Sequence, residues 1–319
     1  MRVVYLSKTS ILSFTGGAEL RTDQVTAELA NEDDEIIVLC GKTDPSLPTT
    51  VEKENRTIKH VQCVPDFLLK YDQIGIYLTL CIFPIMCLFP LFRELRENET
   101  DIVVDMMTPH PTLAVILCKV FDYPIVNIVH GFFDSSMFKT YNPIVASIQL
   151  FTQNLIRLFQ YDHLICPSNH IKSEIISYGI SPNHISVIPN GVDPDKYGSN
   201  YKDSETGELV SVGRLTKTKG QDVLVKSLNI LQERYGREPT LHLVGKGPFK
   251  TQLQELTREL GLVENVNIHG YVSEEKKLDL MESSSLFVYG SKYESFGIVV
   301  LEAMAAGLPI IAIDHPAYH

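Results

Sequence analysis

The amino-acid sequence predicts an α/β protein made of two doubly wound domains in series. Short apolar runs alternate with amphipathic helical segments, which is the pattern of a parallel sheet covered by helices on both faces. This alternation stops in a polar, turn-rich stretch that begins near Asp193, and it then starts again. The length of 319 residues suits two domains, and a hydrophobic fraction of 44% is enough to bury two cores.

The first domain is expected to span residues 1–195. Its predicted strands are short aliphatic runs, each long enough for one buried strand of a parallel sheet. They are Val3–Leu6, Ile36–Cys40, Ile102–Asp105, Ile125–Val129, His163–Cys166 and Ile185–Ile188. Segments between most of these runs, such as Ala18–Ala30, have the apolar spacing of amphipathic helices.

The second domain is expected to span residues 205–319. Its predicted strands are Leu209–Val212, Leu241–Val244, Val266–Ile268, Leu286–Tyr289 and Ile310–Ile313. Its predicted helices are Gln221–Arg234, Phe249–Leu260, Glu274–Glu282 and Ile298–Ala306. Because the sequence stops at HPAYH without a closing helix, we expect this domain to be incomplete.

The composition excludes several classes of function. A net charge of −11 argues against a nucleic-acid-binding protein, which needs a basic surface to displace the counterions of phosphates. The six cysteines are scattered without a Cys-x-x-Cys pair, which indicates reduced thiols rather than a disulfide frame or a zinc site. The polar N-terminus is too short for a secretory signal peptide. We therefore expect a cytoplasmic protein.

One segment, residues 74–92, contains no charged side chain. A membrane-spanning helix is one interpretation, but it would place the strands Val3–Leu6 and Ile102–Asp105 on opposite sides of the bilayer. A helix in the membrane interface, or one lining a groove for a lipid acceptor, agrees better with a single sheet, and we favour it. A buried core helix is the third interpretation. Pro84 and Pro90 would kink any helix here.

The first candidate site follows the first strand of the second domain. Gly213 ends this strand, and Arg214 and Lys219 flank the turn into the next helix. In an open parallel sheet, ligands bind beyond the carboxyl ends of the strands. The planar guanidinium of Arg214, the ammonium of Lys219 and a helix N-terminus together suit a diphosphate. Taken alone, a basic loop of this kind is more often simply solvated.

Two further segments carry possible ligand groups. In LVGKGP, Gly245 and Gly247 allow a close backbone approach, although any tight strand–helix turn requires the same glycines. Glu294 and Glu302 lie in one strand–helix crossover, where two carboxylates could accept hydrogen bonds from vicinal hydroxyls of a sugar or ribose. Helical glutamates are usually solvated, but the helix that carries Glu302 is otherwise apolar. The amides at the start of that helix, which could face a phosphate, belong to Phe296, Gly297, Ile298 and Val299.

In this order, Arg214–(x4)–Lys219–Gly220, LVGKGP and Glu294–(x7)–Glu302 resemble the donor domain of family-4 retaining glycosyltransferases with the GT-B fold. The IPNGVD run resembles the domain junction of that family. The GGAE run and His130-Gly131 resemble its first-domain motifs. Each motif is weak alone, but the combination is specific and covers essentially the whole chain.

The resemblance implies two Rossmann-like domains facing a cleft, the first (1–195) binding an acceptor and the truncated second (205–319) binding a nucleotide-sugar donor. It implies that Arg214 and Lys219 bind the donor diphosphate and neutralise the leaving group. Glu294 would contact hydroxyls of the transferred sugar, and Glu302 would bind the ribose. Gly16 and Gly17 would let the first helix approach the donor phosphates closely. His130 would lie near the reacting sugar.

Such an enzyme needs no metal and no cofactor beyond its donor substrate, so we interpret Asp193-Pro194-Asp195 as structural rather than metal-binding. Two departures from the family pattern stand out. Lys246 occupies a position that is usually acidic, and DHPAYH replaces a Gly-rich loop at the end. The missing part would cover apolar sheet, so we expect exposed hydrophobic surface.

The leading hypothesis is a glycosyltransferase that moves a hexose-type sugar to a lipid-linked or polysaccharide acceptor at the cytoplasmic face of the membrane. Segment 74–92 motivates the membrane contact. An inactive remnant or regulatory partner that binds nucleotide weakly is the alternative from another class. Another GT-B enzyme, such as a nucleotide-sugar epimerase, is disfavoured by the two carboxylates and the GGAE run.

Overall fold

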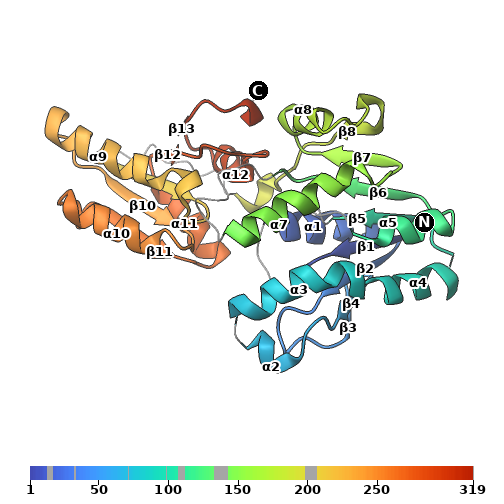
Figure 1. Ribbon diagram of the computed structural model, residues 1–319. Coiled ribbons are helices and arrows are strands. Elements are labelled where there is room, and N and C mark those ends of the chain that lie inside the picture. Colours follow the sequence, from blue (N-terminus) through green and yellow to red (C-terminus); the bar gives the residue numbers. More distant parts are fainter. Residues whose placement is uncertain are drawn as a thin grey trace. The chain divides into compact units, whose positions relative to one another are not determined.

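The computed structural model describes residues 1–12, 17–31, 34–70, 72–97, 99–106, 112–132, 143–197 and 207–318. The chain forms two compact units, Met1–Pro189 and Asn190–His319. Each unit contains one sheet with helices on both of its faces (Figure 1). The predicted α/β class is therefore confirmed.

The sheet of the first unit has the strand order β3-β4-β2-β1-β5-β6-β7-β8. All neighbouring strands are parallel except β3 and β4, which form an antiparallel pair at one edge. The strands are β1 (Arg2–Ser7), β2 (Glu35–Gly41), β3 (Thr50–Lys53), β4 (Arg56–Val61), β5 (Ile102–Asp105), β6 (Ile125–Ile128), β7 (His163–Cys166) and β8 (Ile185–Val187).

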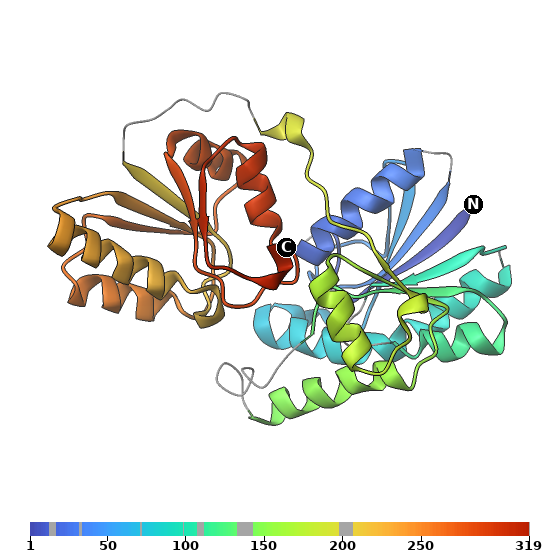
Figure 2. The same ribbon diagram turned by 90° about the horizontal axis from the view of Figure 1, so that it is seen from above.

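Alternate residues of each strand point to two different cores, as the pleat requires. On β1, Val3 and Tyr5 pack with α1, whereas Val4 and Leu6 pack with α4, α5 and α8. Figure 2 shows α1 on one side of this sheet and the helices from α3 to α5 on the other. The helices are α1 (Gly17–Asn31), α2 (Asp66–Leu69), α3 (Asp72–Met86), α4 (Leu88–Glu97), α5 (Ala114–Val120), α7 (Pro143–Asn154) and α8 (Asn169–Ser177), with the 3-10 turn η1 (Leu155–Arg157).

The hairpin of β3 and β4 is absent from the strands predicted above. Its turn is made by Glu54 and Asn55, which both have positive φ angles of 51° and 59°. Two consecutive left-handed residues fit the twist of a tight hairpin, and asparagine tolerates this conformation. β3 is an edge strand, where charged residues are common, and its neighbour β4 carries Arg56 and Lys59, so an apolar pattern does not reveal either strand.

The apolar segment 74–92 forms most of α3 and the start of α4. Within the described residues, Leu78–Glu97 is long and apolar enough to cross a membrane by length and composition, with a mean hydropathy of 1.7. However, β4 before this segment and β5 after it belong to the same sheet. Phe83, Cys87 and Leu91 are fully buried against the first unit. We therefore interpret α3 and α4 as helices that pack on the sheet and do not cross a bilayer.

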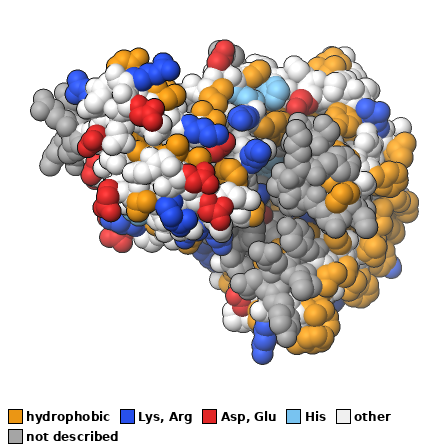
Figure 3. All heavy atoms as spheres, turned by 60° about the vertical axis from the view of Figure 1, so that its left-hand side comes forward, with side chains coloured by type: hydrophobic (Ala, Val, Ile, Leu, Met, Phe, Trp, Pro, Cys, Tyr) orange, Lys and Arg blue, Asp and Glu red, His pale blue; other side chains and the backbone are white. Residues whose placement is uncertain are grey.

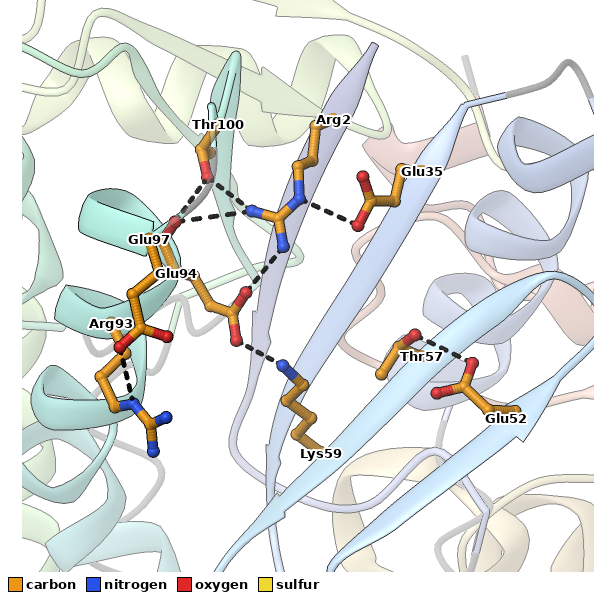
Figure 4. Close-up of polar contacts among 9 residues, drawn as sticks. All are labelled: Arg2, Glu35, Glu52, Thr57, Lys59, Arg93, Glu94, Glu97 and Thr100. Atoms are coloured by element: carbon orange, nitrogen blue, oxygen red, sulfur yellow. Dashed lines mark hydrogen bonds and ion pairs between the residues drawn. The ribbon is translucent and has the colours of Figure 1, made fainter.

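An ion-pair network fixes α4 to the sheet (Figure 4). The buried carboxylate of Glu94 accepts a hydrogen bond from Arg2 Nη2 at 2.7 Å and another from Lys59 Nζ. Arg2 also contacts Glu35 Oε1 at 3.0 Å and Thr100 Oγ1 at 3.1 Å. Three elements, β1, β4 and α4, are thus held together by one charged cluster.

The sheet of the second unit has the order β11-β10-β9-β12-β13, and all its neighbouring strands are parallel. The strands are β9 (Glu208–Val212), β10 (Thr240–Val244), β11 (Val266–Gly270), β12 (Leu286–Tyr289) and β13 (Ile310–Ala312). The helices are α9 (Gln221–Tyr235), α10 (Lys250–Glu259), α11 (Glu274–Ser283) and α12 (Ile298–Ala305). Helices α9 and α10 cover one face of the sheet, and α11 and α12 cover the other.

Candidate functional site

In the second sheet, the direction in which successive strands are added reverses between β9 and β12. The chain leaves β9 toward β10 on one side, and it later returns to place β12 on the other side. At such a switch point the loops after the two central strands diverge, and ligands bind between them. Here these loops are 213–220 after β9 and 290–297 after β12. They contain Arg214, Lys219 and Glu294, three of the four residues predicted to be catalytic.

Lys219 and Glu294 are in direct contact at this switch point. Lys219 ends the 3-10 turn η4 (Lys217–Lys219), and its ammonium forms an ion pair with Glu294 Oε1. The hydroxyl of Tyr289, the last residue of β12, donates to the same carboxylate oxygen and lies 3.3 Å from Lys219 Nζ. Burial and the charge of Glu294 raise the pKa of Tyr289 far above its usual range. From the sequence we expected Lys219 and Glu294 to contact the ligand separately. In the structure without ligand they instead contact each other, and together with Tyr289 they form a cluster of three side chains.

Glu294 is nearly inaccessible, with 7% of its surface exposed. Its backbone N–H lies 3.3 Å from His315 Nε2, and the ring of Tyr293 meets His315 edge-on at 6.3 Å between centroids. These contacts hold the loop after β12 against the segment that follows β13. Sequence reasoning missed His315 because it lies in the run DHPAYH, which departs from the family pattern.

Glu302 lies on α12 and is 4% exposed. Its Oε2 accepts a hydrogen bond from Lys277 Nζ of α11 at 3.0 Å, and a Tyr197 hydrogen bond also stabilises the carboxylate. Burial nevertheless raises the pKa of Glu302 above its usual value. Glu302 is thus a paired, buried carboxylate and not a solvated helical one. Lys277 and Tyr197 could not be found from sequence spacing, because they come from separate elements.

Several glycines let the loops of the site approach one another. A Cβ on Gly220, whose φ is +66°, would lie 1.9 Å from the carbonyl oxygen of Gly290. On Gly245 it would lie 1.9 Å from the Gly213 carbonyl oxygen, and on Gly247 2.2 Å from that of Leu215. These positions accept only glycine because the neighbouring atoms are backbone. The LVGKGP glycines therefore serve loop packing in the free chain.

The start of α12 lies in the same cluster of loops. Gly297 is its N-terminal cap and has a φ of +82°, and the ring of Tyr318 packs against it. The helix then begins at Ile298, followed by Val299, so the amides predicted to face a phosphate do lie at a helix N-terminus. Phe296 precedes the cap.

Two other basic residues that the sequence analysis named, Arg214 and Lys246, differ in their surroundings. Arg214 is exposed, and its carbonyl oxygen accepts a hydrogen bond from Gln221 Nε2 at 3.0 Å, which ties the loop to the start of α9. Lys246, the departure in the LVGKGP turn, places its ammonium 5.2 Å from the ring centroid of Tyr271. That geometry is a cation–π contact.

In the first unit, Gly17 begins α1 and is exposed, while Gly16 lies outside the described residues. His130 directly follows β6 and Val129, at the carboxyl edge of the first sheet. Its Nε2 is buried without a hydrogen-bond partner. Burial, together with the charge of Arg21, lowers the pKa of His130 to about 4. The imidazole is therefore neutral at physiological pH.

Among the described residues, no three His, Cys, Asp or Glu side chains gather so that they could hold a metal ion. The second unit offers lysine and arginine cations, two buried carboxylates and the amides of a helix N-terminus. Such groups can bind a diphosphate and the hydroxyls of sugars.

Comparison with known proteins assigns the family. Residues 15–196 match Glycosyltransferase Family 4, and residues 194–319 match Glycosyl transferases group 1. The chain belongs to glycosyltransferase family 4. The resemblance inferred from the motifs is thereby confirmed.

Individual relatives agree with this assignment. The chain is 33% identical to mannosylfructose-phosphate synthase of Agrobacterium fabrum over 159 residues, which are 44% of this chain and 35% of that protein. It is 29% identical to the GDP-mannose:cellobiosyl-diphosphopolyprenol alpha-mannosyltransferase of Xanthomonas oryzae over 201 residues, 61% of this chain and 50% of that one. The chain thus spans about half or less of the length of these two relatives.

The fold agrees as well. The structure of HepE from Anabaena in complex with UDP and glucose matches 99% of this chain and 82% of that one, with a TM-score of 0.69 and 19% identity. The predicted GT-B fold of two Rossmann-like domains is confirmed by this likeness.

Proposed function

We propose that this protein transfers a sugar with retention from a nucleotide-sugar donor to a lipid-linked or glycan acceptor. The observation that carries the proposal is the contact between Lys219, Glu294 and Tyr289 at the switch point of the second sheet. The names of the relatives support it, since one is a GDP-mannose-dependent mannosyltransferase and HepE is seen with UDP and glucose.

Breaking a sugar–phosphate bond leaves negative charge on the departing diphosphate. Fixed cations directed at that charge stabilise the transition state more than the ground state, and they accelerate the reaction for that reason. In this proposal Lys219 and the exposed Arg214 supply the two cations. The Lys219 ammonium has three N–H groups, so it can keep its contact with Glu294 while it donates to a phosphate oxygen.

The two carboxylates then orient the donor. Glu294 accepts hydrogen bonds from hydroxyls of the transferred sugar, and Glu302 accepts them from the ribose. Burial raises the pKa of Glu302, and its pairing with Lys277 opposes that shift by stabilising the ionised form. The amides at the start of α12 donate to the diphosphate. The proposal requires no metal, because these groups provide the positive charge.

The acceptor is proposed to be reached from a membrane surface. Hydrophobic side chains gather along the right-hand edge of the molecular surface in Figure 3. On α3 and α4 the exposed apolar side chains are Leu78, Ile85, Met86 and Phe89. With Arg93 and Arg96 beside them on α4, these side chains form what we call the apolar surface. Contact of these apolar side chains with lipid favours a peripheral position at the cytoplasmic face of a membrane.

The test is an assay of the purified chain against a panel of UDP- and GDP-sugars, with calorimetry of UDP and GDP alongside. We expect slow hydrolysis of one donor without acceptor and faster transfer when a polyprenyl-diphosphate sugar is added. Nucleotide binding without any turnover would favour the alternative function, an inactive or regulatory partner. Absence of both binding and turnover would exclude the proposal for this chain.

A further inference from the structure

Three arginines are buried among the described residues, and two of them have acidic partners. Arg2 pairs with Glu94 and Glu35, as described above. Arg56 is fully buried and pairs with Asp23 at 2.8 Å and with Glu54. This is the expected arrangement, because a buried charge without a partner is costly.

Arg21 on α1 is the exception. Only 7% of its surface is exposed, yet no acidic side chain in the described part of the chain pairs with it. Its hydrogen bond within the described part of the chain runs from Nη2 to the carbonyl oxygen of Ile188, at the long distance of 3.4 Å. Its Nη1 is buried and has no partner at all. No acidic side chain of the described residues therefore compensates this guanidinium.

The position of Arg21 is informative. Ile188 follows β8 and His130 follows β6, so both lie at the carboxyl edge of the first sheet. His130 is close enough for the charge of Arg21 to lower its pKa, and its Nε2 is a second buried nitrogen without a partner. Ligands of open parallel sheets bind at this edge. Two uncompensated nitrogens at one binding edge point to an acceptor group supplied by a ligand.

We propose that Arg21 and His130 form a binding site for a phosphoryl group of the substrate. A guanidinium presents its N–H groups in a planar fork that matches phosphate oxygens, and His130 Nε2, protonated in one neutral tautomer, adds a third donor. The phosphoryl group supplies the counter-charge that Arg21 lacks. Since neither nitrogen reaches solvent in the free chain, binding must displace the atoms that cover them.

This proposal depends on the function proposed above only for the identity of the substrate. It can be tested by binding alone, without measuring sugar transfer. The probe is inorganic pyrophosphate, titrated by calorimetry into the full chain and into Arg21→Met. The matched control is Arg157→Met, which removes an exposed arginine of the same unit that lies over the ring of Tyr178. We expect Arg21→Met to weaken pyrophosphate binding about 10- to 100-fold, the loss typical of charged hydrogen bonds, and the control to leave it unchanged.

A second readout separates binding from structure. Removing an uncompensated buried cation should leave the Tm of the ligand-free chain unchanged or raise it, whereas removing a structural arginine should lower it. A lower Tm together with unaltered pyrophosphate affinity would overturn the proposal. If Arg21→Met does not fold, Arg21→Lys can replace it, because lysine keeps the positive charge but lacks the planar fork of N–H groups. Pyrophosphate binding as tight in Arg21→Lys as in the wild type would also overturn the proposal.

Competition identifies the source of the phosphoryl group. If saturating UDP or GDP removes the Arg21-dependent pyrophosphate signal, the group belongs to the donor diphosphate. If the signal persists, it belongs to a phosphorylated acceptor. Both results support the site. Failure to turn over any nucleotide sugar would remove the proposed function while leaving the binding result intact.

Discussion

At the scale of single residues, the candidate site is a set of buried charges that satisfy one another in the free chain. Lys219 holds Glu294, and Lys277 holds Glu302. Replacing Lys219 by alanine should lower the rate of sugar transfer about 10²- to 10³-fold, as for other preorganised charge stabilisers. Lys217→Ala is the matched control, because Lys217 lies in the same turn but is exposed. Equal rates in the two variants would contradict the role given to Lys219.

A partly buried charge, Lys8, tests the electrostatics of the first unit. Burial lowers the pKa of Lys8, which follows β1, to about 7. Between pH 7 and 10.5 the unfolded chain therefore binds more protons than the folded chain. The charged lysine lowers the free energy of unfolding by its full amount below pH 7, and this penalty disappears above pH 10.5. Lys8→Met should raise the free energy of unfolding by on the order of 2 kcal/mol at pH 6. Urea unfolding at pH 6 and pH 9 should show a smaller gain at the higher pH.

At the scale of elements, α4 is the helix whose position depends most clearly on charge. Arg2 and Lys59 hold the pKa of Glu94 below its usual value although burial opposes them. The ionised carboxylate therefore adds stability above the unfolded pKa, and this stability is lost as the pH falls through the folded pKa. Glu94→Gln should lower the free energy of unfolding by about 2 kcal/mol at pH 7. Loss of a fully buried ion pair would lower it more, but Lys59 is partly exposed and its charge is screened by solvent. Unfolding measured at a series of pH values from 7 downward checks this, and a cost that does not decrease at all as the pH falls would contradict it.

Most of the parallel strands could be predicted from the sequence because they read as short, largely apolar runs, which is typical of strands covered by helices on both faces of a sheet. β5, β7 and β12 have the predicted bounds, and the others differ by one or two residues. The β3–β4 hairpin could not be predicted from the sequence, since both of its strands carry charged residues and neither reads as an apolar run. The motif spacing placed Lys219 and Glu294 in facing loops. It could not show Tyr289 between them, nor Lys277 against Glu302, because such contacts depend on how α11 and α12 pack.

At the scale of the whole molecule, the apolar surface is the feature that the fold alone does not explain. A helix that packs on a sheet normally turns polar residues outward. On α3 and α4, Ile85 and Phe89 are instead 60% and 70% exposed. Other helices of this unit, such as α5 and α7, expose apolar side chains too, but those of α3 and α4 lie on two consecutive helices, and we propose that they form a binding surface. A membrane is the occupant that also agrees with the lipid-linked acceptor of one relative.

Flotation with lipid vesicles tests this surface. The wild-type chain should float with lipid vesicles, because the exposed apolar side chains of α3 and α4 would be buried in the membrane interface. The double variant Ile85→Glu/Phe89→Glu should reduce the bound fraction at least about 10-fold, since two carboxylates would have to enter the interface. Ile230→Glu is the control, as it adds a carboxylate at an exposed apolar position of α9 in the second unit. If the double variant floats as well as the control while keeping its Tm, α3 and α4 do not form the contact. If the wild type does not float at all, the acceptor must be reached from solution, and the exposed side chains must then serve another partner.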